Sequence, residues 1–195
     1  MTVQPFTRRL CATVAVASLV LGTAALLVGA TEGGKAQFDQ EGALLRPTGY
    51  REWVFVGAPV TPHDMNEGKA PFPEFHNVYI DPASYREYTR TGTFPDGTML
   101  IKELVSVGSK QGASGKGYFQ GEFIGLEASV KDSKRFAQAP GNWAFFSFSN
   151  PDHTLPVKAK AMAQPLAACT GCHQGAAATD LVFTQYYPVL RAARP

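Results

Sequence analysis

Runs of β-branched and aromatic residues alternate with clusters of Gly, Pro and Asp over most of the chain. This pattern is typical of short strands separated by turns. Strands are predicted at 51–57, 75–81, 98–108, 117–130 and 142–148. Most of the connections are too short for crossover helices, so we expect a mainly antiparallel sheet. The predicted fold class is mainly β, of the α+β type, with a few short helices.

Helices are predicted at four places, the shortest of them a single turn at 133–136. Asp81-Pro82 has the form of an N-cap followed by Pro at the first helical position, which opens a helix over 83–90. A C-terminal helical segment should begin near Cys169, and Asp180 is expected to cap a last segment towards Tyr186. Helices are therefore a minor part of the predicted fold.

The strand at 98–108 is apolar on both faces, which indicates a central position in the sheet. Because side chains alternate along a strand, Lys102 shares one face with Leu100 and Leu104. A lysine among leucines either keeps its ammonium group in water or pairs with a carboxylate. Alternatively, Lys102 faces a bound group, where desolvation would favour its nucleophilic, neutral form.

The strand at 117–130 places small and aromatic residues on one face, namely Phe119, Gly121, Phe123, Gly125 and Glu127. Glycines in a strand allow close approach, either of a flat ligand or of a neighbouring strand. Glu127 on the same face is either a solvated carboxylate at the strand end or a general base beside a reactive site. The pattern leaves both alternatives open.

The N-terminus has the pattern of a secretory signal peptide. Arg8 and Arg9 precede an uncharged apolar run, Leu10–Val28, and Val28-Gly29-Ala30 offers small residues for cleavage. A membrane anchor is the alternative, because the run is nearly long enough to span a bilayer. We expect cleavage, which leaves one domain at 31–195, exported to the periplasm.

Charge gives no indication of a polyanionic partner. The chain has 18 basic and 16 acidic residues, and loss of residues 1–30 removes Arg8 and Arg9 and no acid, which leaves 16 of each. A neutral chain gives no electrostatic reason to expect binding to nucleic acid or to anionic lipid.

The motif Cys169-Thr170-Gly171-Cys172-His173 carries the clearest chemistry. A C-x-x-C-H run is the attachment signature of c-type haem, in which two thiols form thioethers and the histidine binds iron. A zinc site would need four ligands, and the chain has no second Cys pair. A thioredoxin-like motif would sit early in a βαβ unit, whereas this motif lies near the C-terminus. The motif therefore predicts covalent haem c, with His173 as its axial ligand.

The sequence also indicates an open position on the iron. Only 22 residues follow His173, and none of them is Met or His. No motif singles out an upstream sixth ligand among Met65, Met99, Met162, His63, His76 and His153. An open position favours binding of small molecules over simple electron transfer.

Seven blocks in order resemble the cytochrome P-460 family, which includes the cytochromes c-prime-beta. They are YREWVFVG (50–57), VYIDPASY (78–85), KELVSVG (102–108), GYFQGEFIGLEASVKD (117–132), GNWAFFSF (141–148), CTGCH (169–173) and DLVFTQYYPVLRAA (180–193). The resemblance runs from about residue 38 to residue 194. It implies a largely antiparallel β fold, a homodimer and a five-coordinate c-type haem.

The resemblance also implies roles for single residues. Lys102 opens the KEL block, where the enzymes of the family carry a lysine bonded to a haem meso carbon. Glu127 lies in the GLEA block, where they carry the carboxylate needed for hydroxylamine oxidation. His76 stands where family members can carry arginine. We place it among the haem-binding residues, with a distal hydrogen-bonding or proton-relay role, and a buried structural role is the alternative. Phe72 and Phe75 are both candidates for packing beside the open iron position.

These implications predict a periplasmic haem oxidoreductase. It would oxidise hydroxylamine to nitrous oxide, or to nitric oxide and nitrite, and pass electrons to an external acceptor such as a periplasmic cytochrome. A non-catalytic, nitric oxide-binding cytochrome c-prime-beta is the main alternative, and an electron-transfer cytochrome is a third.

Overall fold

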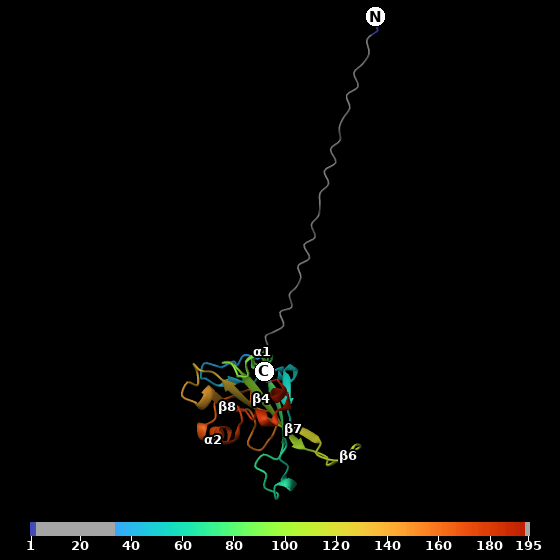
Figure 1. Cartoon of the computed structure of the whole chain (residues 1–195), viewed down its shortest axis with the longest axis vertical. Coiled ribbons are helices and arrows are strands. Elements are labelled where there is room, and N and C mark those ends of the chain that lie inside the picture. The colour runs from blue at the N-terminus through green and yellow to red at the C-terminus, as the bar shows by residue number, and fades with distance from the viewer. Residues whose placement is uncertain (3–33, 194–195) are drawn as a thin grey trace.

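The computed structural model describes residues 1–2 and 34–193 (Figure 1). The predicted signal peptide lies outside these residues apart from its first two positions, and Cys11 lies outside them as well. Among the described residues, no helix has the length and apolar character needed to cross a membrane.

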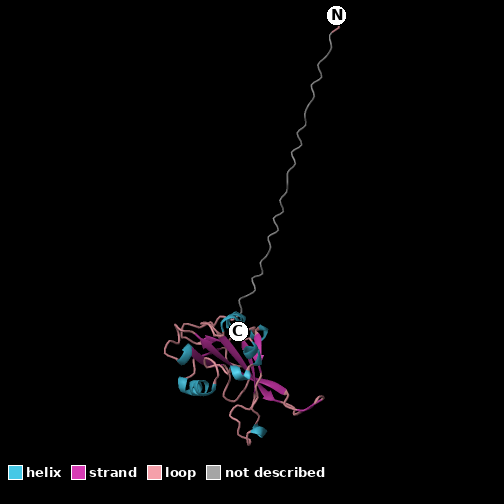
Figure 2. Cartoon of the chain, viewed as in Figure 1, coloured by secondary structure: helices cyan, strands magenta, loops and turns pink. Residues whose placement is uncertain are grey.

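A five-stranded antiparallel sheet forms the centre of the molecule, as the sequence predicts (Figure 2). Its order is β2-β3-β4-β7-β8, so β4 is the central strand. The strands are β2 (Val54–Gly57), β3 (Phe75–Ile80), β4 (Met99–Val107), β7 (Gln120–Lys131) and β8 (Trp143–Ser147). Two small ribbons accompany it, formed by β1 (Leu44–Leu45) with β9 (Lys160–Ala161) and by β5 (Gln111–Gly112) with β6 (Gly115–Lys116).

Short helices lie around the sheet. The α-helices are α1 (Pro82–Thr91), α2 (Leu166–Ala176) and α3 (Pro188–Ala192). The 3-10 turns are η1 (Tyr50–Glu52), η2 (His63–Met65), η3 (Pro140–Asn142) and η4 (Thr184–Tyr186). The expected helix after Asp81 is confirmed, and so is the helical C-terminal segment that carries the haem-attachment motif.

Apolar cores lie on both faces of the sheet, which explains why β4 is apolar on both sides. Met99 and Ile101 contribute to one core, which also contains Phe146 and Phe148. On the other face, Leu100 packs in a second core. This second core joins the sheet to α1 and to the C-terminal segment, through Tyr88, Val182, Tyr187 and Leu190.

A β-bulge in β7 changes the expected alternation of its side chains. Leu104 pairs with Gly125 and Val105 with Phe123, so Ile124 is an extra residue between them. Phe123 therefore packs against the core on the opposite face from Glu127. The predicted single face of glycines and aromatics is wrong for this reason.

Gly125 allows the close approach of another part of the chain rather than of a ligand. A Cβ at this position would collide with the Ser149 hydroxyl and lie 3.0 Å from Cδ1 of Leu104. Of the two explanations for glycine in this strand, close packing against a neighbouring segment is the one observed.

The cap of α1 also links that helix to the sheet, and it yields a test of the fold. Asp81 is 4 % exposed, and its carboxylate accepts hydrogen bonds from Ser84 N (2.8 Å) and Met99 N (3.0 Å). Asp81→Ala removes the cap and leaves a buried N–H group of β4 unpaired, so the free energy of unfolding should fall by about 2–4 kcal/mol. Urea titration measures this loss, and Glu87→Ala on the exposed side of α1 is the control. A loss below about 1 kcal/mol for D81A would contradict the account.

Candidate functional site

A lysine–glutamate pair lies on the face of the sheet that also bears Leu100. Lys102 on β4 stands directly opposite Glu127 on β7, and Lys102 Nζ lies 2.7 Å from Glu127 Oε2. Val78 on β3 and Ser147 on β8 extend the same row across the sheet. Both charged side chains are partly exposed and line a cavity. Lys102 therefore makes an ion pair and also faces a ligand-sized space.

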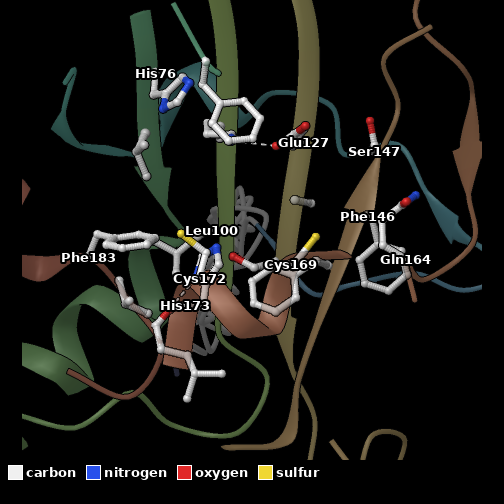
Figure 3. Close-up of a pocket in the computed structure, with 18 of the residues that line it drawn as sticks. His76, Leu100, Glu127, Phe146, Ser147, Gln164, Cys169, Cys172, His173 and Phe183 are labelled. Atoms are coloured by element: carbon white, nitrogen blue, oxygen red, sulfur yellow. Dashed lines mark hydrogen bonds and ion pairs between the residues drawn. The ribbon is translucent and has the colours of Figure 1, made fainter. Parts of the chain in front are cut away.

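Helix α2 places the haem-attachment motif on the other side of this cavity. Cys169, Cys172 and His173 all line it, opposite the sheet (Figure 3). Its volume is about 470 Å³, within the range of cofactor pockets, roughly 300–1,000 Å³. The wall is mainly apolar and includes Phe145, Phe183, Leu100, Leu181 and Val182. The tertiary structure thus brings the predicted residues of three chain segments to one cavity.

His173 is held in one tautomer by a backbone carbonyl. Its Nδ1 lies 2.6 Å from the oxygen of Leu181, and because a carbonyl can only accept, Nδ1 donates the proton. Burial lowers the pKa of His173, although the bond to Leu181 opposes that shift. The rings of Phe145 and Phe183 pack at 4.4 Å and 4.7 Å between centroids. A neutral imidazole with a free Nε2 is the form that binds a metal.

The carbonyl that binds His173 lies in a tight turn that sequence reasoning missed. Thr179 and Val182 close the turn by two backbone hydrogen bonds, and Asp180 (φ 47°) and Leu181 (φ 59°) are both left-handed. Each such non-glycine residue costs about 1–3 kcal/mol of strain. The expected cap at Asp180 is wrong: the following turn η4 begins after Phe183, and Asp180 instead pairs with Lys131.

The donor groups of the cavity fit a haem better than a lone metal ion. Cys169 and Cys172 are free thiols, and burial together with the charge of Glu127 raises the pKa of Cys169. Within residues 34–193, no three His, Cys, Asp or Glu side chains gather as a metal site. One imidazole nitrogen and two thiols beside an apolar cavity match a porphyrin, which brings its own four nitrogens to the iron.

His76 lines the same cavity and pairs with a buried carboxylate. Its Nε2 lies 3.4 Å from Glu74 Oε1, and its ring packs edge-on against Phe72. Burial alone would raise the pKa of Glu74. Hydrogen bonds from His76 and the backbone, with the charge of Lys102, hold that pKa below its usual value. His76 thus has a structural partner and also faces the cavity, so both of its predicted roles stay open.

Of the two phenylalanines that the sequence offered beside the open iron position, Phe72 lines the cavity and Phe75 does not. Phe72 lines it and lies 5.8 Å from Lys102 Nζ, measured to the ring centroid, whereas Phe75 is buried and absent from the lining. Sequence reasoning could not choose between these residues. Sequence reasoning also missed Glu74. The only feature that could have drawn attention to it was His76, two positions further along the chain.

A second cavity of about 520 Å³ lies beside the first, and Phe72 and Glu127 line both. Its wall includes several titratable groups: His63, Asp64, Glu74, Lys110 and His153. Of the six candidate sixth ligands, His76 alone is among the described residues that line the first cavity. Met65 and Met162 are exposed, and Met99 belongs to the opposite core. Glu127 therefore stands between the cavity with the haem-attachment motif and a second cavity that several titratable side chains line.

Comparison with known proteins agrees with this arrangement. The family model of cytochrome P-460 matches residues 47–184, a segment that contains Lys102, Glu127 and the haem-attachment motif. The chain belongs to the cytochrome P-460 family. It is therefore a haem cytochrome, with the mainly β fold expected from the resemblance. A search of curated proteins found no match.

The environment of Cys169 can be tested by alkylation of the protein before haem attachment. Because burial and Glu127 raise the pKa of Cys169, it holds less thiolate at neutral pH and should react with iodoacetamide several-fold more slowly than the exposed Cys172. Timed alkylation followed by peptide mass spectrometry measures both rates in one sample. Glu127→Gln should increase the rate at which Cys169 is alkylated, whereas the control Glu122→Gln should leave that rate unchanged. Equal rates at the two thiols would contradict the burial of Cys169.

Proposed function

We propose that this protein is an exported c-type cytochrome that oxidises hydroxylamine. The products would be nitrous oxide, or nitric oxide and nitrite. The observation that carries the proposal is the Lys102–Glu127 pair, which faces the cavity opposite the haem-attachment motif. Once its ammonium group loses the proton, Lys102 can supply a nucleophilic amine beside the cofactor, and Glu127 can supply a proton acceptor. A simple electron carrier would need neither group.

Four residues would hold the haem. Cys169 and Cys172 would form the thioethers, and Nε2 of His173 would bind the iron, since Nδ1 is occupied by Leu181. Lys102 would add a third covalent tether, in which its neutral amine nitrogen replaces the hydrogen of a haem meso carbon. This is a two-electron oxidation, so the two electrons would leave to the external electron acceptor and the two protons to solvent. The bound haem would supply an iron with one exchangeable position and the capacity to take up electrons.

Glu127 is suited to accept the protons that hydroxylamine oxidation releases. Bonding of the Lys102 amine to the porphyrin would remove its ammonium charge, and this would free Glu127 from its present ion pair. The carboxylate also lines the second cavity, where several titratable groups could receive protons. Glu127 would thus take protons at the first cavity and release them towards the second.

The apolar side chains would limit water and orient the site. Phe145 and Phe183 fix the ring of His173. Phe72 stands between Lys102 and His76, within ring-contact distance of both. Phe72 would thus form an apolar wall beside Lys102 and His76, where hydroxylamine would bind.

One observation favours a second function, the binding of nitric oxide without turnover. Lys102 is an ion-paired ammonium here, and a lysine that keeps its proton cannot bond to the porphyrin. Such a protein would resemble the cytochromes c-prime-beta, with Phe72 at the open position. A simple electron-carrier cytochrome would have a sixth ligand on the iron, for which His76 is the available candidate among the described residues of the cavity. A homodimer, periplasmic location and a cytochrome as electron acceptor stay predictions.

The lysine tether decides between the two main functions. In the purified holoprotein, a digest should yield the peptide with Lys102 joined through haem to the peptide with Cys169 and Cys172. Lys102→Leu should lose this species, show an ordinary c-type spectrum and lose most hydroxylamine oxidation. Lys160→Leu, which breaks a surface pair with Asp39 away from both cavities, is the control. Clean separation of the two wild-type peptides would support the nitric oxide binder instead.

The role of Glu127 is tested by truncation. Glu127→Ala should leave haem content unchanged and lower kcat for hydroxylamine by about 10²-fold or more, the typical loss of a general base. Steady-state oxidation with an artificial electron acceptor measures the effect. Glu122→Ala, an exposed carboxylate on the same strand, should keep wild-type turnover. Turnover unchanged in E127A would remove Glu127 from the mechanism.

A further inference from the structure

An ion pair connects the end of the central sheet to the turn that holds His173. Lys131 is the last residue of β7, and its ammonium group pairs with the carboxylate of Asp180. Both side chains are largely buried, with 17 % and 26 % exposed, and Lys131 Nζ lies 5.7 Å from the centroid of the Trp143 ring. The sheet and the Trp143 ring therefore hold Lys131 in place. Through the ion pair, Lys131 restrains Asp180 from outside the turn.

The turn needs such a restraint because its backbone is unfavourable for its sequence. Both central residues have positive φ, a conformation that Asp tolerates and Leu rarely adopts. Gly141 packs against the turn so closely that a Cβ there would lie 3.0 Å from Asp180 Oδ1. The conformation is thus imposed by surrounding groups, one of which is the ammonium group of Lys131, paired with Asp180.

This conformation points the carbonyl of Leu181 at Nδ1 of His173, 2.6 Å away. A hydrogen bond to this nitrogen raises the basicity of the opposite one, and such bonds tune a bound metal. We propose that Lys131 and Asp180 form a positioning pair that sets the strength of the Leu181–His173 bond, and through it the bond of His173 to iron. This inference rests on the proposed binding of iron by His173.

The test separates positioning from a simple charge effect. Asp180→Asn removes a negative charge, and Lys131→Met removes a positive one, so direct electrostatics would shift the haem reduction potential in opposite directions. If the pair positions the carbonyl, both variants weaken the same hydrogen bond. Both should then raise the potential and lower the iron–histidine stretching frequency of the ferrous protein. Spectroelectrochemistry and resonance Raman spectroscopy of the holoprotein measure these quantities.

Two further variants complete the test. Lys131→Arg keeps the ion pair and should retain the wild-type reduction potential and iron–histidine stretching frequency. If D180N fails to load haem, the comparison of K131R with K131M still tests the inference. Lys160→Met breaks a distant surface pair with Asp39 and should change neither readout. Opposite shifts of the potential in D180N and K131M, or an unchanged stretching frequency in both, would overturn the inference. Absence of the iron–histidine band from the wild type would instead overturn the ligand role of His173, and the inference with it.

Discussion

The register between β4 and β7 is the constraint on which the candidate site depends. It places Lys102 opposite Glu127 on one face, where cross-strand side chains are close enough to form the 2.7 Å ion pair. A slip of one residue would turn Lys102 into the core that contains Met99 and Ile101. The cost of burying an unpaired ammonium group among those side chains opposes such a slip. The same apolar face that stabilises the sheet therefore specifies where the charged pair lies.

The second element of the site is the C-terminal segment, which lies against the other side of the cavity. Its packing depends on apolar contacts of Val182, Tyr187 and Leu190 with the sheet and α1. Within this packed frame, a strained two-residue turn presents the Leu181 carbonyl to His173. Strain of this kind persists only where the surroundings determine the conformation, and here it lies next to the residue with the clearest functional motif.

Membership of the cytochrome P-460 family establishes a haem cytochrome, and the cavity shows which side chains this chain offers to the haem. The chemistry beyond haem binding depends on the state of Lys102. As an ammonium group it neutralises Glu127, and the site is then an apolar pocket with a satisfied charge pair. As a neutral amine it would leave Glu127 available for proton transfer. Under the proposed function, the protonation and bonding state of this one side chain would separate a gas-binding protein from an oxidase.

Much of the fold and site followed from the sequence because the relevant signals are local. Alternating apolar runs predicted the strands, and Asp81-Pro82 predicted the start of α1. Spacing alone singled out Cys169, Cys172 and His173 as haem-binding candidates, and all three line the cavity. The bulge at Ile124 could not be predicted, since one extra residue leaves no mark in a pattern of alternation.

Only the tertiary structure decided which distant groups meet. It selected Phe72 over Phe75, paired His76 with Glu74, and joined Lys131 to Asp180. It also supplied the hydrogen-bond acceptor of His173, a backbone oxygen. Every residue carries such an oxygen, so no amino-acid letter can mark the one that is used. Its direction is set by packing between segments far apart in the chain, and that packing exists only in the folded protein.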